Sequence, residues 1–417
     1  MKWVLAALFS LWLAAGYSPA QTKPAARPAP QIEAQIMRLL DQKVAKLDFR
    51  NVPVGDVLDF LHEASGLNIQ AEWNELSAAG IEKTHPISLE LKTVSARAAL
   101  EAICRLTGAQ VRIGWDVRDG AVVISTREKL VSKMVVRVRD AFEMDPGADR
   151  AERFQKTLAT IQETVEPELW NTVGGTSQIT ERNGKFYIIA PPLAHRQIDR
   201  LEGLVKRGMT PQDWARLLGA RQKLRNKKFT LNFDGKTFRE IVPMISAVAE
   251  VPILIDQRAM EVAGAKIDGK VALKVTDVSG VKVLELLFDQ ISDDTTKVSL
   301  DAIADGEVLI ITAGDSDMQR NLAAFDITPQ FARKAGVRPG DAPAEQTEAI
   351  IDFIRQTIAP DTWGPGNVGI IKPAGLRRLI CAQTPGNLVA VAELMGAAPG
   401  LLPKPSRPAP ARTALVP

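Results

Sequence analysis

The chain of 417 residues carries one pattern of apolar residues twice. In the first occurrence, an alternating segment at 47–49 is followed by apolar residues at i, i+3, i+4 and i+7, which is the spacing of one helix face. The same spacing returns 184 positions later, where Phe238 takes the place of Val54. The two sets are Val54, Val57, Leu58 and Leu61, and Phe238, Ile241, Val242 and Ile245. A unit that occurs twice favours two copies of a small fold over one large core.

The match continues in the same order after this helix. It takes in a short apolar strand, an alternating strand, a second helix and a closing strand that follows an Asp-Gly turn. The matched segments are 67–69 and 253–255, 87–91 and 271–275, 99–103 and 283–287, and 121–124 and 307–311. The order strand, helix, strand, strand, helix, strand, strand predicts a small α+β domain.

A second kind of domain follows each first one. The sequence predicts a strand at 135–138 or 325–327 and an amphipathic helix at 150–165 or 345–358. A glycine-rich turn, further strands and a last helix come next. The further segments are the strands 178–181 and 186–190 and the helices 195–204 and 388–394. The order β-α-β-β-α indicates a second small α+β domain.

Both amphipathic helices end in nearly the same short sequence, which holds Pro167 and Trp170 in the first copy and Pro360 and Trp363 in the second. Proline lacks the backbone donor that would continue a helix. The tryptophan three residues later can fold back over the apolar helix face, as large aromatic residues are usually buried. The alternative is that these tryptophans contact a partner. The four residues are the candidate structural or partner-contact motif.

The N-terminus has the pattern of a signal peptide. Lys2 precedes an apolar run at 4–15, and small residues at 18–20 offer a cleavage site. A retained membrane anchor is the alternative, but about a dozen apolar residues are too few to span a hydrocarbon core that needs roughly twenty. No later segment is long and apolar enough, so the protein is expected to be exported with no integral membrane segment after cleavage.

These patterns divide the chain into eight parts. Between the two copies, Thr210 and Pro211 form a helix start, with a capping residue followed by proline. The predicted parts are a signal peptide at 1–20, a Pro/Ala linker with a leading helix at 21–43, first-type domains at 44–128 and 228–314, second-type domains at 129–208 and 315–398, a linker helix at 209–227 and a Pro/Ala tail at 399–417.

The segments 47–58 (LDFRNVPVGDVL), 65–69 (SGLNI) and 87–91 (ISLEL) resemble the secretin and TonB-dependent receptor short N-terminal domain. The second copy is similar but departs where Val251 and Pro252 replace the usual Gly-Leu-Asn. The phrase that holds the proline and tryptophan resembles the KH-like, ring-building domain of secretins. The chain ends in a Pro/Ala tail where secretins have a long glycine-rich barrel domain, so the resemblance does not extend to a pore.

Residues that could carry chemistry do not form a recognisable site. The three histidines, His62, His85 and His195, have no second ligand at metal-binding spacing, and no nucleophile-and-base signature is present. Cys104 and Cys381 lie in apolar surroundings in different copies and are expected to be buried free thiols. The sequence therefore predicts no enzyme, no cofactor and no metal.

The net charge of +3 and the near balance of basic and acidic residues argue against a nucleic-acid-binding face. The glycine clamp of RNA-binding KH domains is also not evident. The resemblance implies an envelope scaffold or adaptor whose partner is a secretin, a secretion-system subunit or a TonB-like protein. The alternatives are a self-assembling, ring-forming envelope protein and an envelope enzyme or carbohydrate-binding protein, for which no residue argues.

Overall fold

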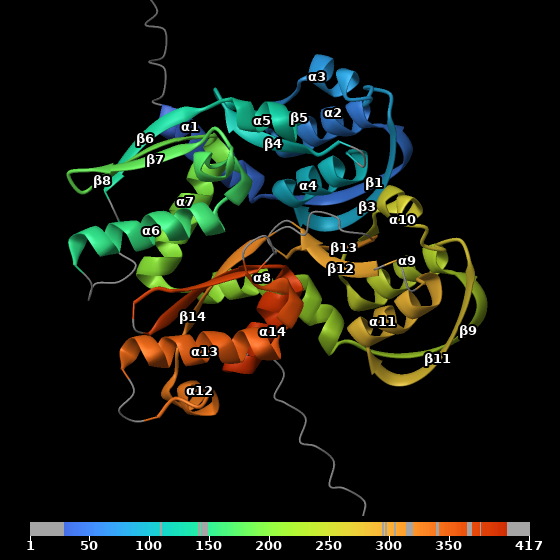
Figure 1. Ribbon diagram of the computed structural model, residues 1–417. Coiled ribbons are helices and arrows are strands. Elements are labelled where there is room, and N and C mark those ends of the chain that lie inside the picture. The colour runs from blue at the N-terminus through green and yellow to red at the C-terminus, as the bar shows by residue number, and fades with distance from the viewer. Residues whose placement is uncertain are drawn as a thin grey trace, which may run out of the picture.

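The protein has an α+β fold, as predicted (Figure 1). The computed structural model describes residues 29–108, 111–140, 142, 149–293, 296, 298–303, 306–313, 320–338, 342–364, 369–375 and 377–397. The predicted signal peptide and the Pro/Ala tail lie outside these residues. We call the part from α1 to α7 the first half and the part from α8 to α14 the second half.

The first half opens with two sheets that share one set of helices. β1 and β3 form a two-stranded antiparallel ribbon, and β2, β5 and β4 form a sheet in which β2 runs parallel to β5. The elements are α1 (Ala29–Leu40), β1 (Lys43–Pro53), α2 (Val54–Ser65), β2 (Ile69–Ala71), α3 (Trp73–Ala78), β3 (Pro86–Ser95), α4 (Ala96–Thr107), β4 (Ile113–Arg118) and β5 (Ala121–Thr126).

The second half begins with the same arrangement. β9 and β11 form the ribbon, and β10, β13 and β12 form the sheet, with β10 parallel to β13. The elements are α8 (Pro211–Asn226), β9 (Lys228–Thr237), α9 (Phe238–Ala249), β10 (Ile253–Ile255), α10 (Gln257–Val262), β11 (Lys270–Ser279), α11 (Gly280–Ile291), β12 (Val298–Ile303) and β13 (Val308–Ala313).

Three details of this unit differ from the sequence prediction. The strand predicted at 67–69 lies two residues later, because Leu67 is a buried residue of the turn and the ladder to β5 starts at Ile69. The strand predicted at 307–311 begins at Val308. The helices α3 and α10 were not predicted, since each has six residues and buries a single large side chain, Leu76 or Met260, which is too few to form a periodic pattern.

The second-type unit is a three-stranded antiparallel sheet with helices on one face. The strand order is β6–β8–β7 in the first half and β14–β16–β15 in the second. The elements are α5 (Arg127–Ser132), β6 (Val135–Asp140), α6 (Arg150–Thr164), β7 (Gln178–Arg182), β8 (Lys185–Ala190), α7 (Pro192–Arg207), β14 (Asn321–Asp326), α12 (Pro329–Lys334), α13 (Pro343–Thr357), β15 (Ile370–Pro373), β16 (Arg378–Gln383) and α14 (Pro385–Met395). The strand predicted at 325–327 starts earlier, at Asn321, because its whole length pairs with β16. The short helix α12 was not predicted.

Hydroxyl side chains fix where several helices begin. The Thr210 hydroxyl accepts a hydrogen bond from the Asp213 backbone N–H at 3.1 Å, and the Asp213 carboxylate accepts one in return from the Thr210 N–H. This reciprocal cap with Pro211 at the first position confirms the predicted start of α8. Ser95 and Ser279 cap α4 and α11 in equivalent places.

The two halves pack through different surfaces. The sheet of β10, β12 and β13 lies against α4 of the first half, and the sheet of β14–β16 lies against α7 (Figure 1). In both contacts the second half offers a sheet face and the first half offers a helix. Such a head-to-tail contact leaves one sheet face of the first half without an equivalent cover.

Candidate functional site

The predicted motif around Pro167 and Trp170 forms a buried plug. α6 ends at Thr164, and Pro167 opens a single 3₁₀ turn after Glu166, whose φ is 42°. Trp170 is fully buried, and its indole Nε1 donates to the Val165 carbonyl at 2.7 Å. The side chain therefore packs under the end of the helix and is not available to a partner in this conformation.

The second half repeats this plug closely. Pro360 follows Ala359, whose φ is 40°, and the Trp363 indole donates to the Ile358 carbonyl at 2.6 Å. Trp363 is also buried. In both halves the tryptophan of the motif is buried under the helix end, while Pro167 is half-buried and Pro360 is exposed.

His62 has a hydrogen-bonding role that recurs in another residue type. Its Nδ1 lies 2.6 Å from the Leu67 carbonyl, which it fixes at the end of α2. At the equivalent position of α9, the Ser246 hydroxyl donates to the Val251 carbonyl, also at 2.6 Å. His62 is thus a structural residue whose function a serine performs in the other half.

His195 is completely buried at the start of α7. Its Nε2 lies 3.1 Å from the Val135 carbonyl. Burial, together with the nearby cations Arg137 and Arg139, lowers the pKa of this imidazole to about 4. Burial also lowers the pKa of His85, with Arg258 adding to the effect. The three histidines lie in separate places.

The cysteines are buried free thiols, as predicted. Burial raises the pKa of the Cys104 thiol to about 12 and also raises that of Cys381. Since the thiolate is the reactive form, neither sulfur is activated as a nucleophile. Within the described residues, no group of three or more His, Cys, Asp and Glu residues is arranged to hold a metal ion.

Two buried carboxylates pair with side chains of other elements, and no sequence pattern singles them out. Asp116 of β4 is fully buried and lies 2.5 Å from Arg196 of α7. Glu166 contacts Arg127 and Gln197, and burial raises the pKa of its carboxyl. Asp116 joins the first-type unit to the second-type unit, and Glu166 ties α5 to α7. Both acids sit in pairs that serve packing.

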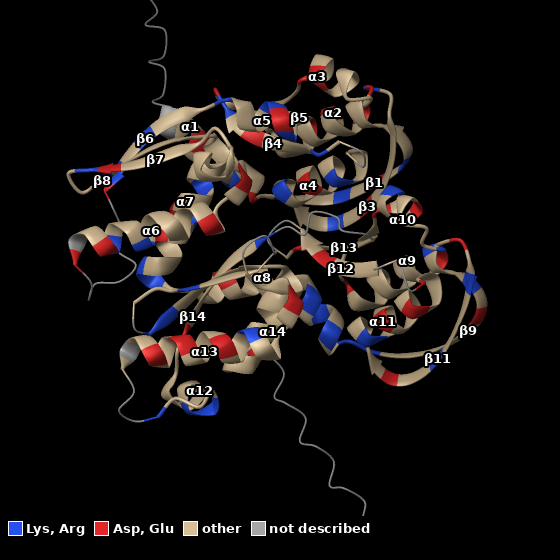
Figure 2. Ribbon diagram, in the orientation of Figure 1, with Lys and Arg blue, Asp and Glu red and all other residues tan. Residues whose placement is uncertain are grey.

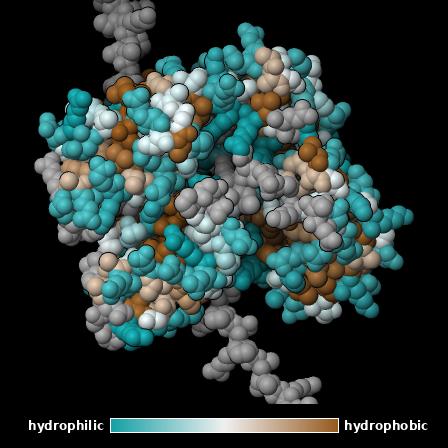
Figure 3. Space-filling view, in the orientation of Figure 1, coloured by the Kyte–Doolittle hydropathy of each residue, from teal (hydrophilic) through white to brown (hydrophobic). Residues whose placement is uncertain are grey.

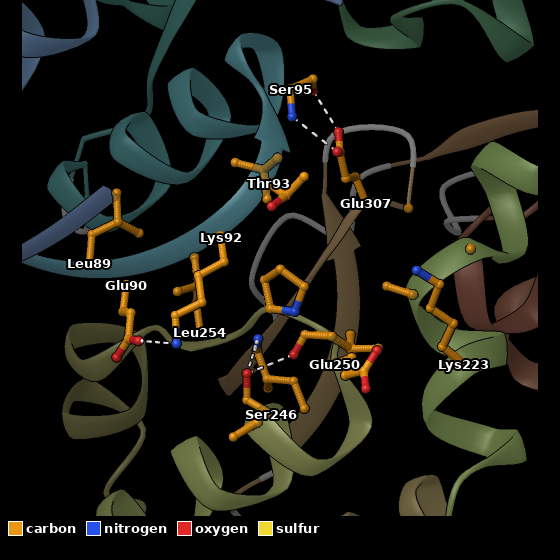
Figure 4. Close-up of a pocket in the computed structure, with 18 of the residues that line it drawn as sticks. Leu89, Glu90, Lys92, Thr93, Ser95, Lys223, Ser246, Glu250, Leu254 and Glu307 are labelled. Carbon is orange, nitrogen blue, oxygen red and sulfur yellow. Dashed lines mark hydrogen bonds and ion pairs between the residues drawn. The ribbon is translucent and has the colours of Figure 1, made fainter. Parts of the chain in front are cut away.

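A cleft of about 1510 Å³ lies between the halves, where the β1–β3 ribbon faces α8, α9 and the residues before β10 (Figure 4). Polar side chains that line the cleft form hydrogen bonds and ion pairs with one another. Glu307 accepts hydrogen bonds from the Ser95 backbone N–H at 3.0 Å and the Ser95 hydroxyl at 2.6 Å. Lys92 and Glu90 form an ion pair at 2.9 Å. We interpret the cleft as the seam between the halves.

On the outer face of the β6–β8–β7 sheet, β6 and β8 contribute exposed apolar side chains, whereas β7 contributes the polar Gln178 and Thr180. Val136, Val138 and Tyr187 are 64%, 51% and 39% exposed, and Ile189 beside them is half-buried. Val136 pairs with Ile189 and Val138 with Tyr187, so the four side chains form one block, which we call the open face. Brown, apolar atoms gather at the upper left of Figure 3, where Figure 1 shows these strands.

The open face arises because β6 directs its arginines toward the helices and Val136 and Val138 toward solvent. Arg137 and Arg139 alternate with its valines and point toward the helices, where Arg139 lies 2.5 Å from Asp199 of α7. The valines consequently face outward. The alternation of valine and arginine at 135–139 shows that the two faces of the strand differ. By itself it predicts that the valines are buried, unless the acidic partners of the arginines on α7 are known.

Charged residues of both signs are interspersed over the face of the molecule in Figure 2. None of the helices within the described residues combines the length and the apolar character needed to cross a bilayer.

No protein-family model and no curated protein sequence matches the chain. Among solved structures, two that contain secretin N-terminal domains match it. The structure of XcpQ N012 matches at 8% identity, covers 60% of this chain and 100% of its own, and has a TM-score of 0.17. The Salmonella SPI-1 type III secretion injectisome basal body proteins InvG, PrgH and PrgK match at 11% identity, 65% of this chain, 42% of that chain and a TM-score of 0.16.

Proposed function

We propose that the protein is a non-enzymatic scaffold or adaptor of the cell envelope that binds other proteins. The observation that carries this proposal is the open face, an apolar block on the outside of a well-ordered sheet. Contiguous apolar surface of this kind is typical of protein-binding sites. The small domains are held in fixed positions by buried side chains, so the open face is presented on a rigid support.

The setting of this activity follows from the sequence. The signal-peptide pattern supports export, and the resemblance of the segments at 47–58 and 65–69 to the secretin and TonB-dependent receptor short N-terminal domain supports a role in secretion or in transport across the outer membrane. The partner we propose is a secretin, a secretion-system subunit or a TonB-like protein.

Affinity capture tests the proposal. The full chain, expressed with its own N-terminus and tagged at its C-terminus, is used as bait in envelope extracts, beside a mock column that carries the tag alone. We expect enrichment of at least one envelope protein above the mock column. If no protein is enriched over a range of salt concentrations, the scaffold function is wrong.

Self-assembly into a ring is the second candidate, and the charges at the seam weigh against it. Arg105 of α4 forms an ion pair with Asp256 at 3.2 Å across the halves. A further copy added in the same manner would bring Asp289, the equivalent of Arg105, against Glu72, the equivalent of Asp256. Two carboxylates would then replace an ion pair, which costs affinity. Light scattering over micromolar concentrations separates the candidates, since a scaffold of this kind stays monomeric.

A further inference from the structure

In the second half, the positions that correspond to the open face are covered. Leu322 and Ala324 of β14 are the second and fourth residues of the first strand, as Val136 and Val138 are in β6. They are 5% and 2% exposed, and Ile380, the counterpart of Tyr187, is fully buried. Together with Ala382 they form what we call the covered face, which packs against the first half. This sheet face therefore occurs twice in the chain, and at one of the two places another part of the chain is bound to it.

The partner on the covered face is an amphipathic helix, α7. The Arg200 guanidinium donates to the Leu322 carbonyl at 3.5 Å, and Arg378 donates to the Val205 carbonyl at 2.8 Å near the C-terminal end of the helix. A cation at this end satisfies carbonyls that have no partner within the helix and complements the helix dipole. An ion pair between Lys372 and Glu163 of α6 closes the edge of the contact at 2.7 Å.

The open face reproduces two of the features that receive α7, the apolar block and the cation at one end, whereas Gln178 and Thr180 of β7 stand where β15 has Ile370 and Lys372. Lys185 opens β8 as Arg378 opens β16, and each pairs with the last residue of the neighbouring strand. Lys185 lies 3.7 Å from Asp140, and Arg378 lies 2.6 Å from Asp326. The open face thus has an apolar block with a cation at one end, in the same register as the covered face.

The second half of another copy does not supply a helix that matches α7. At the position of Arg200, α14 carries Glu393, which pairs with Arg225 of α8. At the position of Glu163, α13 carries Gln356. α14 also ends at Met395 and has 11 residues, whereas α7 has 16. α14 of another copy therefore does not match the open face in the way that α7 matches the covered face.

We propose that the open face binds an amphipathic α-helix of a different protein, in the orientation in which α7 binds the covered face. The helix lies with its apolar stripe on Val136, Val138 and Tyr187, and its C-terminal carbonyls meet Lys185. This inference rests on the proposed scaffold function and adds the surface, the shape of the partner and its direction. It is the helix-in-groove mode of recognition applied to a sheet.

Site-specific photo-cross-linking of the full chain tests the inference. A benzophenone amino acid replaces Val138 on the open face or, as the control, Val262, which is 77% exposed on α10. After irradiation in the native cells, cross-linked peptides are sequenced. We expect the Val138 position to capture a segment of another protein that has helical apolar periodicity, and the Val262 position not to capture it. Adding Val136→Asp to the Val138 variant is expected to reduce the capture about tenfold or more, since a charge then faces the apolar stripe.

Three results would overturn the inference: cross-links to a second copy of this chain, cross-links to a segment without helical periodicity, or equal yields from the two positions. The affinity capture described above keeps this failure separate from that of the scaffold function. If the full chain still enriches envelope proteins while the Val138 position cross-links none of them, the scaffold function stands and the open face is not its binding surface.

Discussion

The open face of β6–β8–β7 and the covered face of β14–β16 occupy the same place in two units with the same strand order. Val136 is 64% exposed where Leu322 is 5% exposed, and both are apolar. In the second half, α7 of the same chain covers this sheet face. In the first half, no helix among the described residues covers the equivalent face. The same strand face is therefore covered by a helix in one half and exposed to solvent in the other, which is the basis for proposing that the open face is a binding surface.

The tryptophan plugs are a feature in which the two halves are alike. Trp170→Ala removes a fully buried indole and is expected to lower the free energy of unfolding by about 3–5 kcal/mol, as large-to-small core changes do. Trp363→Ala should have nearly the same effect, because its burial and its hydrogen bond are equivalent. Urea unfolding followed by circular dichroism measures both. A loss below about 1 kcal/mol in either variant would contradict the plug as a packing device.

The two faces should respond very differently to the same change. Leu322→Ala leaves a cavity under α7 and is expected to cost about 2–5 kcal/mol. Val136→Ala, at the matching position of the open face, should stay within about 0.5 kcal/mol because the side chain is largely in solvent already. Chemical denaturation of the two variants measures the difference. Equal losses would mean that the open face is covered in the isolated protein.

Between about pH 6.5 and pH 4, the buried His195 of the first half should make stability depend on pH. His195 is held neutral, with its pKa lowered to about 4, while the unfolded chain has the ordinary value of 6.5. Between these values the unfolded state binds the proton and the folded state does not, so stability falls as the pH drops from about 6.5 toward 4. The loss is up to about 3 kcal/mol.

The second half has Leu388 at this position and does not titrate there. The variant His195→Leu supplies the control, since it should remove this part of the pH dependence. Urea unfolding at pH 7 and pH 5 measures the change for both proteins. An unchanged difference between the two pH values in the variant would show that other groups carry the effect.

The smallest effect concerns the carbonyl that His62 and Ser246 fix in the two halves. His62→Ala is expected to cost about 0.5–1.5 kcal/mol, the net contribution of one hydrogen bond. His62→Ser, which copies the second half, should recover part of this loss. Thermal unfolding of the two variants measures the difference. If serine is no better than alanine, the equivalence of the two hydrogen bonds does not extend to their energies.

The fold could largely be predicted from the sequence because its helices have long apolar stripes and its strands alternate. The stripe beginning at Val54 and its counterpart at Phe238 located the longer helices of the first-type units. Helices with one large buried side chain, such as α3 around Leu76, gave no periodic signal. Domain boundaries from the repeat remain predictions.

The candidate site could be predicted only in part. The two proline-tryptophan segments were visible because nearly the same sequence occurs twice, and the structure buries their tryptophans. The open face was hidden, since a strand that alternates Val138 with Arg139 predicts buried valines. Only the position of Asp199 on α7, which pairs with the arginine, reverses that assignment. Long-range pairing of this kind is not encoded in local periodicity.

The most direct test compares the unchanged chain with a variant in the affinity capture, beside a control variant. The variant carries Val136→Asp and Val138→Asp, with Val262→Asp as the matched surface control. Circular dichroism first establishes that all three fold alike, as expected for changes at exposed positions. We expect the envelope protein that is captured by the unchanged chain and by the Val262 variant to be lost from the double variant. Equal capture by all three would contradict a binding role for the open face.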